Sequence, residues 1–267
     1  MSNGLHVRST VELSSTHRLR AAFTLLELSI VLVIMGLLIG GVFAGQSLVH
    51  NAQINAFLSE SNRYQTAFQA FREQYQALPG DMTNATTVWG TAGGTGSDIA
   101  CQNTVSVTSA TCNGNGNGLI STSVVSQDEM VRAWQHLANA KIIEGSYIGV
   151  YLPGGWQAGI NIPTSKYGST TSWGVLESDA WPTAGDVNWF AADYGGGNNL
   201  TTHFTGSTIS GKDAWSVDKK IDDARPAQGN VVAGFWSTCT TAGAKTDVSA
   251  AYRLSDGHCN LTFLTSF

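Results

Sequence analysis

The chain has 267 residues, of which 42% are apolar and 12% are charged, and its net charge is −5. This apolar share is sufficient for a buried core and excludes an intrinsically disordered protein. An acidic chain without basic clusters offers no electrostatic footprint for a phosphate backbone, so we expect no nucleic acid among its partners.

Residues 23–44, FTLLELSIVLVIMGLLIGGVFA, form an apolar run with Glu27 as its single charge. As an α-helix, such a run spans about 33 Å, which matches a hydrocarbon core of about 30 Å. The first 22 residues carry a charge of +2, and the remaining residues carry −7. Because positively charged flanks tend to stay in the cytoplasm, we predict a single-pass membrane helix with the rest of the chain outside.

The small residues before this run distinguish it from an ordinary secretory signal, whose cleavage site follows the apolar stretch. Ala22 followed by FTLLELSIVLVIMGLL resembles the class III signal of type IV pilins and type II secretion pseudopilins. The resemblance implies that residues 1–22 are a leader, that prepilin peptidase cuts between Ala22 and Phe23, and that the new amine of Phe23 is methylated. Two positions depart from the pattern, because Ala22 stands where Gly is usual and Ala44 where many members have Pro.

Glu27 is a carboxylate within an apolar helix, which costs about 2.5 to 3.5 kcal/mol on insertion scales. Its expected partner is the amine of Phe23 on a neighbouring subunit, which makes Glu27 an assembly residue. The alternative is a glutamate near the membrane edge whose side chain reaches the headgroups.

Beyond the apolar run, large apolar residues recur at three- and four-residue steps until Pro79 ends the pattern. They are Ile54, Phe57, Leu58, Tyr64, Phe68, Phe71, Tyr75 and Leu78. We therefore predict one helix over residues 23–78, with a transmembrane and assembly part at 23–44 and an amphipathic part at 45–78. A coiled-coil dimer is the alternative partner for the stripe, but the spacing drifts from a strict heptad.

Residues 79–267 are predicted to be a β-rich globular domain, because 30 glycines and many Ser, Thr and Asn residues mark short strands joined by tight turns. The resemblance implies an α+β fold with the lollipop architecture of pilins, in which the long N-terminal helix packs on this domain. Strands are expected at residues 146–152, 188–194, 231–239 and 251–263, and a capped helix from Ser126 to about Ile143. The asparagines of residues 113–117 imitate a calcium loop but lack its acidic ligands, so we predict Asn-Gly turns there.

The four cysteines are Cys101, Cys112, Cys239 and Cys259. Their even number and the lack of a C-x-x-C pair indicate disulfides rather than zinc or redox chemistry. Three connectivities are possible, and we favour the two short-range pairs. The compartment is then oxidising, such as the periplasm or the cell surface.

Residues 210–226, SGKDAWSVDKKIDDARP, predict a short capped helix that contains a candidate metal site. Asp218 and Asp222 lie four residues apart on one face, with Asp223 adjacent, and like charges so placed repel unless a cation lies between them. Oxygen-rich clusters suit calcium, and several secretion pseudopilins carry calcium in this general part of the fold. Calcium is therefore the possible cofactor.

The alternative is a solvated acidic face that is neutralised by Lys219, Lys220 and Arg225. The segment also resembles a DxKxDDGxP pattern of large prepilin-like proteins, as does LPGD at residues 78–81. Ala224 replaces the Gly of that pattern, which leaves a special backbone turn there in question.

Four tryptophans fall between residues 156 and 189, either as core residues or as a face that binds sugars or a partner. They are Trp156, Trp173, Trp181 and Trp189.

The sequence contains no G-x-S-x-G, H-E-x-x-H or Walker pattern, so we expect no catalytic residues and no enzyme. The predicted function is that of a prepilin-like structural subunit of a type IV pilus or a type II secretion pseudopilus. Its expected partners are prepilin peptidase, copies of itself or other pilins, and inner-membrane lipid before assembly. Its globular domain is expected in the periplasm, and the alternative function is a minor pilin or adhesin at a filament tip.

Overall fold

The structure is a computed structural model in which two compact units, Met1–Val49 and His50–Phe267, are described separately. The residues described are 24–120, 128–152, 156–168, 171–177, 198–204, 209–234, 239–241, 249–255 and 258–264. The predicted leader, residues 1–22, and the predicted strand at 188–194 lie outside them.

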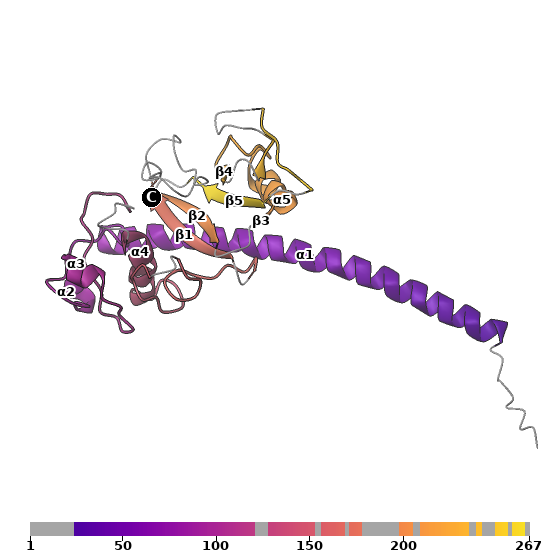
Figure 1. Ribbon diagram of the computed structural model, residues 1–267, viewed down its shortest axis with the longest axis horizontal. Coiled ribbons are helices and arrows are strands. Elements are labelled where there is room, and N and C mark those ends of the chain that lie inside the picture. The colour runs from indigo at the N-terminus through magenta and orange to yellow at the C-terminus, as the bar shows by residue number, and fades with distance from the viewer. Residues whose placement is uncertain are drawn as a thin grey trace, which may run out of the picture. The chain divides into compact units, whose positions relative to one another are not determined.

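Helix α1, Leu25–Tyr75, is the first element of the chain and contributes to both units (Figure 1). In the first unit, every described residue from Thr24 to Val49 is exposed. From Ile30 to Gly45 this stretch consists only of Leu, Ile, Val, Met, Phe, Gly and Ala, so its side chains present an apolar surface. The predicted long N-terminal helix is therefore confirmed.

In the second unit, the remainder of α1 buries one face. Its buried residues are Ile54, Phe57, Glu60, Ser61, Tyr64, Ala67, Phe68 and Phe71. They recur at helical spacing, so the predicted amphipathic stripe is confirmed, with the addition of two polar members that the pattern did not indicate. The helix ends at Tyr75, and Gln76 follows in a left-handed conformation with φ 52°, which stops the helical hydrogen bonding before Pro79.

The sheet is small and antiparallel in the described residues. Its strands are β1 (Thr171–Glu177), β2 (Asn198–Phe204), β3 (Ile209–Ser210), β4 (Val231–Gly234) and β5 (His258–Phe263). β1 pairs with β2, while β5 pairs with β2, β3 and β4. The two C-terminal strands fall within the predicted ranges, and the α+β class is confirmed.

The predicted strand at residues 146–152 is wrong, because the structure forms an irregular loop there. Gly149 has φ 69°, a left-handed conformation that interrupts an extended chain. The backbone of Ile148 also bonds two separate loops, donating to Ile160 and accepting from Ser106. The composition of the segment favoured a strand, but none of the strands β1 to β5 in the described residues pairs with it.

Four shorter helices complete the described elements: α2 (Ala85–Trp89), α3 (Ile99–Gln102), α4 (Asp128–Asn139) and α5 (Gly211–Ile221). α4 and α5 correspond to the two predicted capped helices, although the predicted cap Ser126 lies outside the described residues. At α5, the Ser210 hydroxyl accepts a hydrogen bond from the Asp213 backbone N–H at 3.1 Å, which is the predicted N-terminal cap.

The core of the second unit is aromatic. Phe57 of α1 stacks on Trp173 of β1 at 4.9 Å between ring centroids, and Tyr64 of α1 meets Trp134 of α4 edge-on at 5.0 Å. Trp156 and Trp173 are both buried. Their predicted role as core residues is therefore the right one, whereas Trp181 and Trp189 lie outside the described residues.

Both cysteine pairs form disulfides in the second unit. Cys101 at the end of α3 bonds Cys112, and Cys239 bonds Cys259 of β5. All four are fully buried or nearly so.

Candidate functional site

The apolar stretch of α1 begins with a reciprocal hydrogen-bonded cap. The Thr24 hydroxyl accepts from the Glu27 N–H at 3.2 Å, and the Glu27 carboxylate accepts from the Thr24 N–H at 2.8 Å and from its hydroxyl at 3.0 Å. This is a capping box, which satisfies donors that the first turn of a helix otherwise leaves without partners. The pattern T-x-x-E at residues 24–27 was available in the sequence, but the interpretation of Glu27 as an assembly residue missed it.

The rest of the stretch has the length and composition of a membrane span. α1 contains an 18-residue window that is apolar enough to cross a bilayer, and none of that window is buried against the protein. Ala22 and Phe23, the predicted residues for cleavage and methylation, lie outside the described residues.

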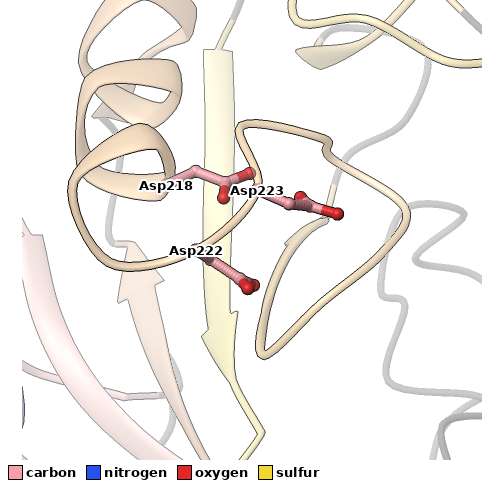
Figure 2. Close-up of side chains that lie close together, drawn as sticks. All are labelled: Asp218, Asp222 and Asp223. Atoms are coloured by element: carbon pink, nitrogen blue, oxygen red, sulfur yellow. The ribbon is translucent and has the colours of Figure 1, made fainter.

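The three aspartates of the predicted metal site do converge (Figure 2). Asp218 lies in the last turn of α5, Asp222 follows the helix as its C-cap, and Asp223 comes next. One carboxylate oxygen from each lies within 4.8 Å of the others. Asp218 is buried, Asp222 is half-buried and Asp223 is exposed, so the cluster opens from the protein interior to the surface.

Backbone donors hold each carboxylate in place. Asp218 accepts from the Ala224 N–H at 3.0 Å and from the Tyr252 hydroxyl at 2.8 Å. Asp222 accepts from the N–H groups of Asn230 and Val231, and Asp223 accepts from the Arg225 N–H at 2.8 Å. Because an ionised carboxylate offers about four lone-pair positions, each of the three retains capacity for a further ligand.

The electrostatics of this acidic turn, defined as Asp218, Asp222 and Asp223, disfavour three bare charges. Burial raises the pKa of Asp218 to about 7, and the neighbouring charges of Asp222 and Asp223 act in the same direction. Without a counter-charge, Asp218 therefore stays protonated at mildly acidic pH, where an exposed aspartate would be ionised.

The basic residues that were expected to neutralise this turn have other partners in the described part of the chain. The ammonium of Lys219 lies 4.5 Å from the centre of the Trp215 ring, and that of Lys220 donates to Asn55 at 2.8 Å. The guanidinium of Arg225 donates to Gln228 at 3.2 Å. The described structure thus does not show the neutralised face that was the alternative to a cation site.

The turn that follows α5 keeps its special backbone without a glycine. Ala224 has φ 62°, the left-handed conformation in which glycine is usual. Its N–H is the donor to Asp218, so this conformation is part of what positions the carboxylate. The special backbone turn therefore forms although Ala224 replaces the glycine of the pattern.

The LPGD segment serves as a structural clamp. The Asp81 carboxylate accepts from three successive backbone N–H groups, those of Gly116, Asn117 and Gly118, at 2.6, 3.0 and 2.9 Å. The side-chain oxygens of Asn115 and Asn117 accept from N–H groups two residues ahead, which confirms the predicted Asn turns.

His136 of α4 completes this clamp as a neutral side chain. Its Nδ1 accepts from the Gly80 N–H at 3.0 Å, so the ring proton resides on Nε2, beside the Thr111 hydroxyl at 3.0 Å and the Cys112 carbonyl at 3.3 Å. Burial, with a contribution from the charge of Arg132, lowers the pKa of His136 to about 3. This histidine therefore has a structural environment.

Comparison with known proteins identifies the N-terminal segment. Residues 17–43 match the prokaryotic N-terminal methylation motif. No curated protein and no solved structure matches the chain. The matched segment contains the capping box and most of the exposed apolar part of α1.

Proposed function

From the type IV pilin-like class III signal that this chain carries, we propose that it is a prepilin-like structural subunit of a type IV pilus or a type II secretion pseudopilus. The observation that supports the proposal is the methylation motif at residues 17–43, followed by a helix that is apolar and exposed from Leu25 to Val49. In this role prepilin peptidase cuts between Ala22 and Phe23, and the apolar helix joins neighbouring subunits. In this role the chain is the substrate of cleavage and methylation and is not itself an enzyme.

The same segment supports storage in the bacterial inner membrane before assembly. A helix with a continuous exposed apolar surface is stable in lipid or against other such helices, and not in water. The second unit then lies in the periplasm, where its disulfides persist.

Glu27 has two tasks in this proposal. Within one chain it closes the capping box with Thr24. In the filament its charge receives the amine of Phe23 from the neighbouring subunit, which offsets the cost of a carboxylate in an apolar environment.

We also propose that the acidic turn binds calcium. Three carboxylates on one short segment converge within 4.8 Å, and the nearby basic side chains are engaged elsewhere in the described residues. Carboxylate oxygens are the ligands that calcium prefers. Occupation would tie the end of α5 to the residues after it.

Mass spectrometry of the native N-terminus tests the main proposal, in membranes and in filaments sheared from the cells. A methylated peptide that starts at Phe23 is expected. Its abundance in the sheared fraction indicates a surface pilin, whereas restriction to membranes indicates a pseudopilin or a minor subunit at a filament tip. A chain that retains Met1 in every fraction contradicts the proposal.

A further inference from the structure

The exposed face of α5 has an unusual composition. Placed at 100° per residue, its solvent-facing positions before the terminal Ile221, which is also exposed, occupy one continuous arc of about 140°. They are Lys212, Trp215, Ser216, Lys219 and Lys220. We call these five residues the lysine–tryptophan face, and it contains three cations and no acidic residue.

The opposite side of α5 is fixed in the core, so the direction of this face is determined. Asp213, Ala214, Val217 and Asp218 are buried there. Trp215 packs partly against the core and keeps part of its ring accessible beneath the ammonium of Lys219.

Two contacts place α5 beside the residues that directly follow the apolar stretch. His50 is the first residue after Val49, and its Nε2 lies 2.7 Å from the Asp213 carboxylate. Five residues further along α1, Asn55 accepts from Lys220. A helix rises about 7.5 Å over five residues, so α5 lies alongside the first turns of α1 beyond the apolar stretch.

His50 is bonded to Val49 along the chain, so a membrane that holds residues up to Val49 has its headgroup layer at His50, the residue that contacts the start of α5. The polar layer on each side of the hydrocarbon core is about 5 to 8 Å thick. Tryptophan rings and lysine side chains are favoured there, because each combines an apolar body with a polar end. The acidic turn follows the opposite end of α5, beyond Lys220, and not the end beside His50.

We propose that the lysine–tryptophan face binds anionic phospholipid headgroups of the membrane in which the apolar helix is stored. Each lysine near an anionic surface strengthens such binding roughly fivefold. The contact holds the second unit against the membrane until the subunit is extracted into a filament. The inference rests on the membrane-anchored state proposed above.

Lysine modification of the full chain in lipid nanodiscs tests this contact. Nanodiscs of phosphatidylcholine alone are compared with nanodiscs that also contain phosphatidylglycerol, and acetylation rates are read by peptide mass spectrometry. Lys212 and Lys219 are expected to react about fivefold more slowly in the anionic discs. Lys141 and Lys166, which are exposed elsewhere on the second unit, serve as internal controls and are expected to react equally in both.

The protection is expected to disappear in about 1 M NaCl, where the screening length falls to about 3 Å. The variant Lys212→Gln should weaken the protection of Lys219, whereas Lys141→Gln should leave it unchanged. Equal rates for Lys212 and Lys219 in both lipids overturn the inference. Protection that depends on the number of chains per disc, and not on lipid charge, overturns it in favour of a contact between subunits.

Failure of the anchored state is separately visible. A chain that does not co-purify with nanodiscs of either lipid contradicts the membrane storage on which both proposals rest. A chain that inserts stably but shows unprotected lysines contradicts the headgroup contact alone.

Discussion

The indole Nε1 of Trp173 donates a hydrogen bond to the Glu60 carboxylate at 2.8 Å, joining β1 to α1 inside the core. The same carboxylate oxygen accepts from the Ser165 hydroxyl at 3.1 Å and from the Lys166 N–H at 2.9 Å. A glutamate that is 4% exposed on the packed face of a helix thus anchors a loop more than one hundred residues away in the chain.

Glu60→Ala is expected to lower the free energy of unfolding by about 3 kcal/mol, because three donors, two of them buried and one half-buried, lose their acceptor. Urea unfolding of the detergent-solubilised chain, followed by tryptophan fluorescence, measures the change. Glu60→Gln retains an acceptor and should cost less. Glu73→Ala, at an exposed position of the same helix, is the matched control and should change little; a cost equal to that of Glu60→Ala would contradict this account.

The buried His136 makes stability fall with acidification. The pKa of His136 is about 3 in the folded chain, against about 6.5 in an unfolded chain. Between these values the unfolded chain binds a proton that the folded chain does not, so the free energy of unfolding decreases as pH falls through this window. The slope from one such residue is at most about 1.4 kcal/mol per pH unit.

His136→Asn keeps a side-chain acceptor for the Gly80 N–H but removes the titration. Its free energy of unfolding is expected to be lower than that of the native chain near neutral pH and to fall less steeply between pH 6 and pH 4. Urea unfolding at a series of pH values gives both slopes. Parallel slopes would mean that His136 is not the residue responsible.

Calcium is expected to raise the melting temperature of the chain at pH 7.5. A ligand at about one hundred times its dissociation constant stabilises the folded state by about 2.7 kcal/mol. Asp223→Asn should abolish most of this response, since Asp223 is exposed and its only side-chain hydrogen bond in the described structure is to the Arg225 N–H. Glu144→Gln, at another exposed acidic position, should leave the response intact. An unchanged response in Asp223→Asn would argue against the acidic turn as the site.

The calcium response should also depend on pH. The pKa of Asp218 is raised to about 7, so in the absence of a cation its stabilising contribution is complete below about pH 4 and is lost as pH rises through 7. Calcium binds the deprotonated carboxylates. Calorimetric titrations should therefore show weaker binding at pH 5.5 than at pH 7.5, with proton release at intermediate pH.

Ala224→Gly is expected to stabilise the chain by about 0.5 to 1 kcal/mol, because a residue with a Cβ is strained at φ 62°. The control Ala70→Gly, within α1, should have the opposite sign and cost about 1 kcal/mol. Thermal unfolding of the two variants compares them directly. Destabilisation by both would indicate that the turn does not impose the left-handed conformation.

Glu27→Gln separates the two tasks of Glu27, because an amide oxygen preserves the capping box but carries no charge. We expect normal cleavage before Phe23 and loss of the subunit from sheared filaments. Thr24→Ala, which keeps the charge and weakens the cap by about 1 kcal/mol, should still be incorporated. Incorporation of Glu27→Gln at the native level would leave the cap as the main role of this glutamate.

Local pattern alone was sufficient for α1. A continuous run of Leu, Ile and Val can satisfy its backbone in lipid only as a helix, and the aromatic steps from Phe57 to Phe71 show which face is buried. The helix over residues 211–221 was likewise predictable, because its N-terminal cap is local. The capping residue, Ser210, accepts a hydrogen bond from the backbone N–H of Asp213, only three residues further along the chain.

Only the tertiary structure decided the features that depend on distant partners. The chain from residue 146 to 152 has the composition of a strand, yet its hydrogen bonds go to two loops. The burial of Glu60 depends on hydrogen-bond donors more than one hundred residues away in the chain. Lys220 bonds Asn55 on another helix and not the neighbouring aspartates.

The sequence by itself determined the apolar helix and its methylation motif, since these depend on neighbours along the chain. The contacts that leave the acidic turn unneutralised in the described residues, and those that place α5 beside His50, depend on packing between segments that are distant in the sequence.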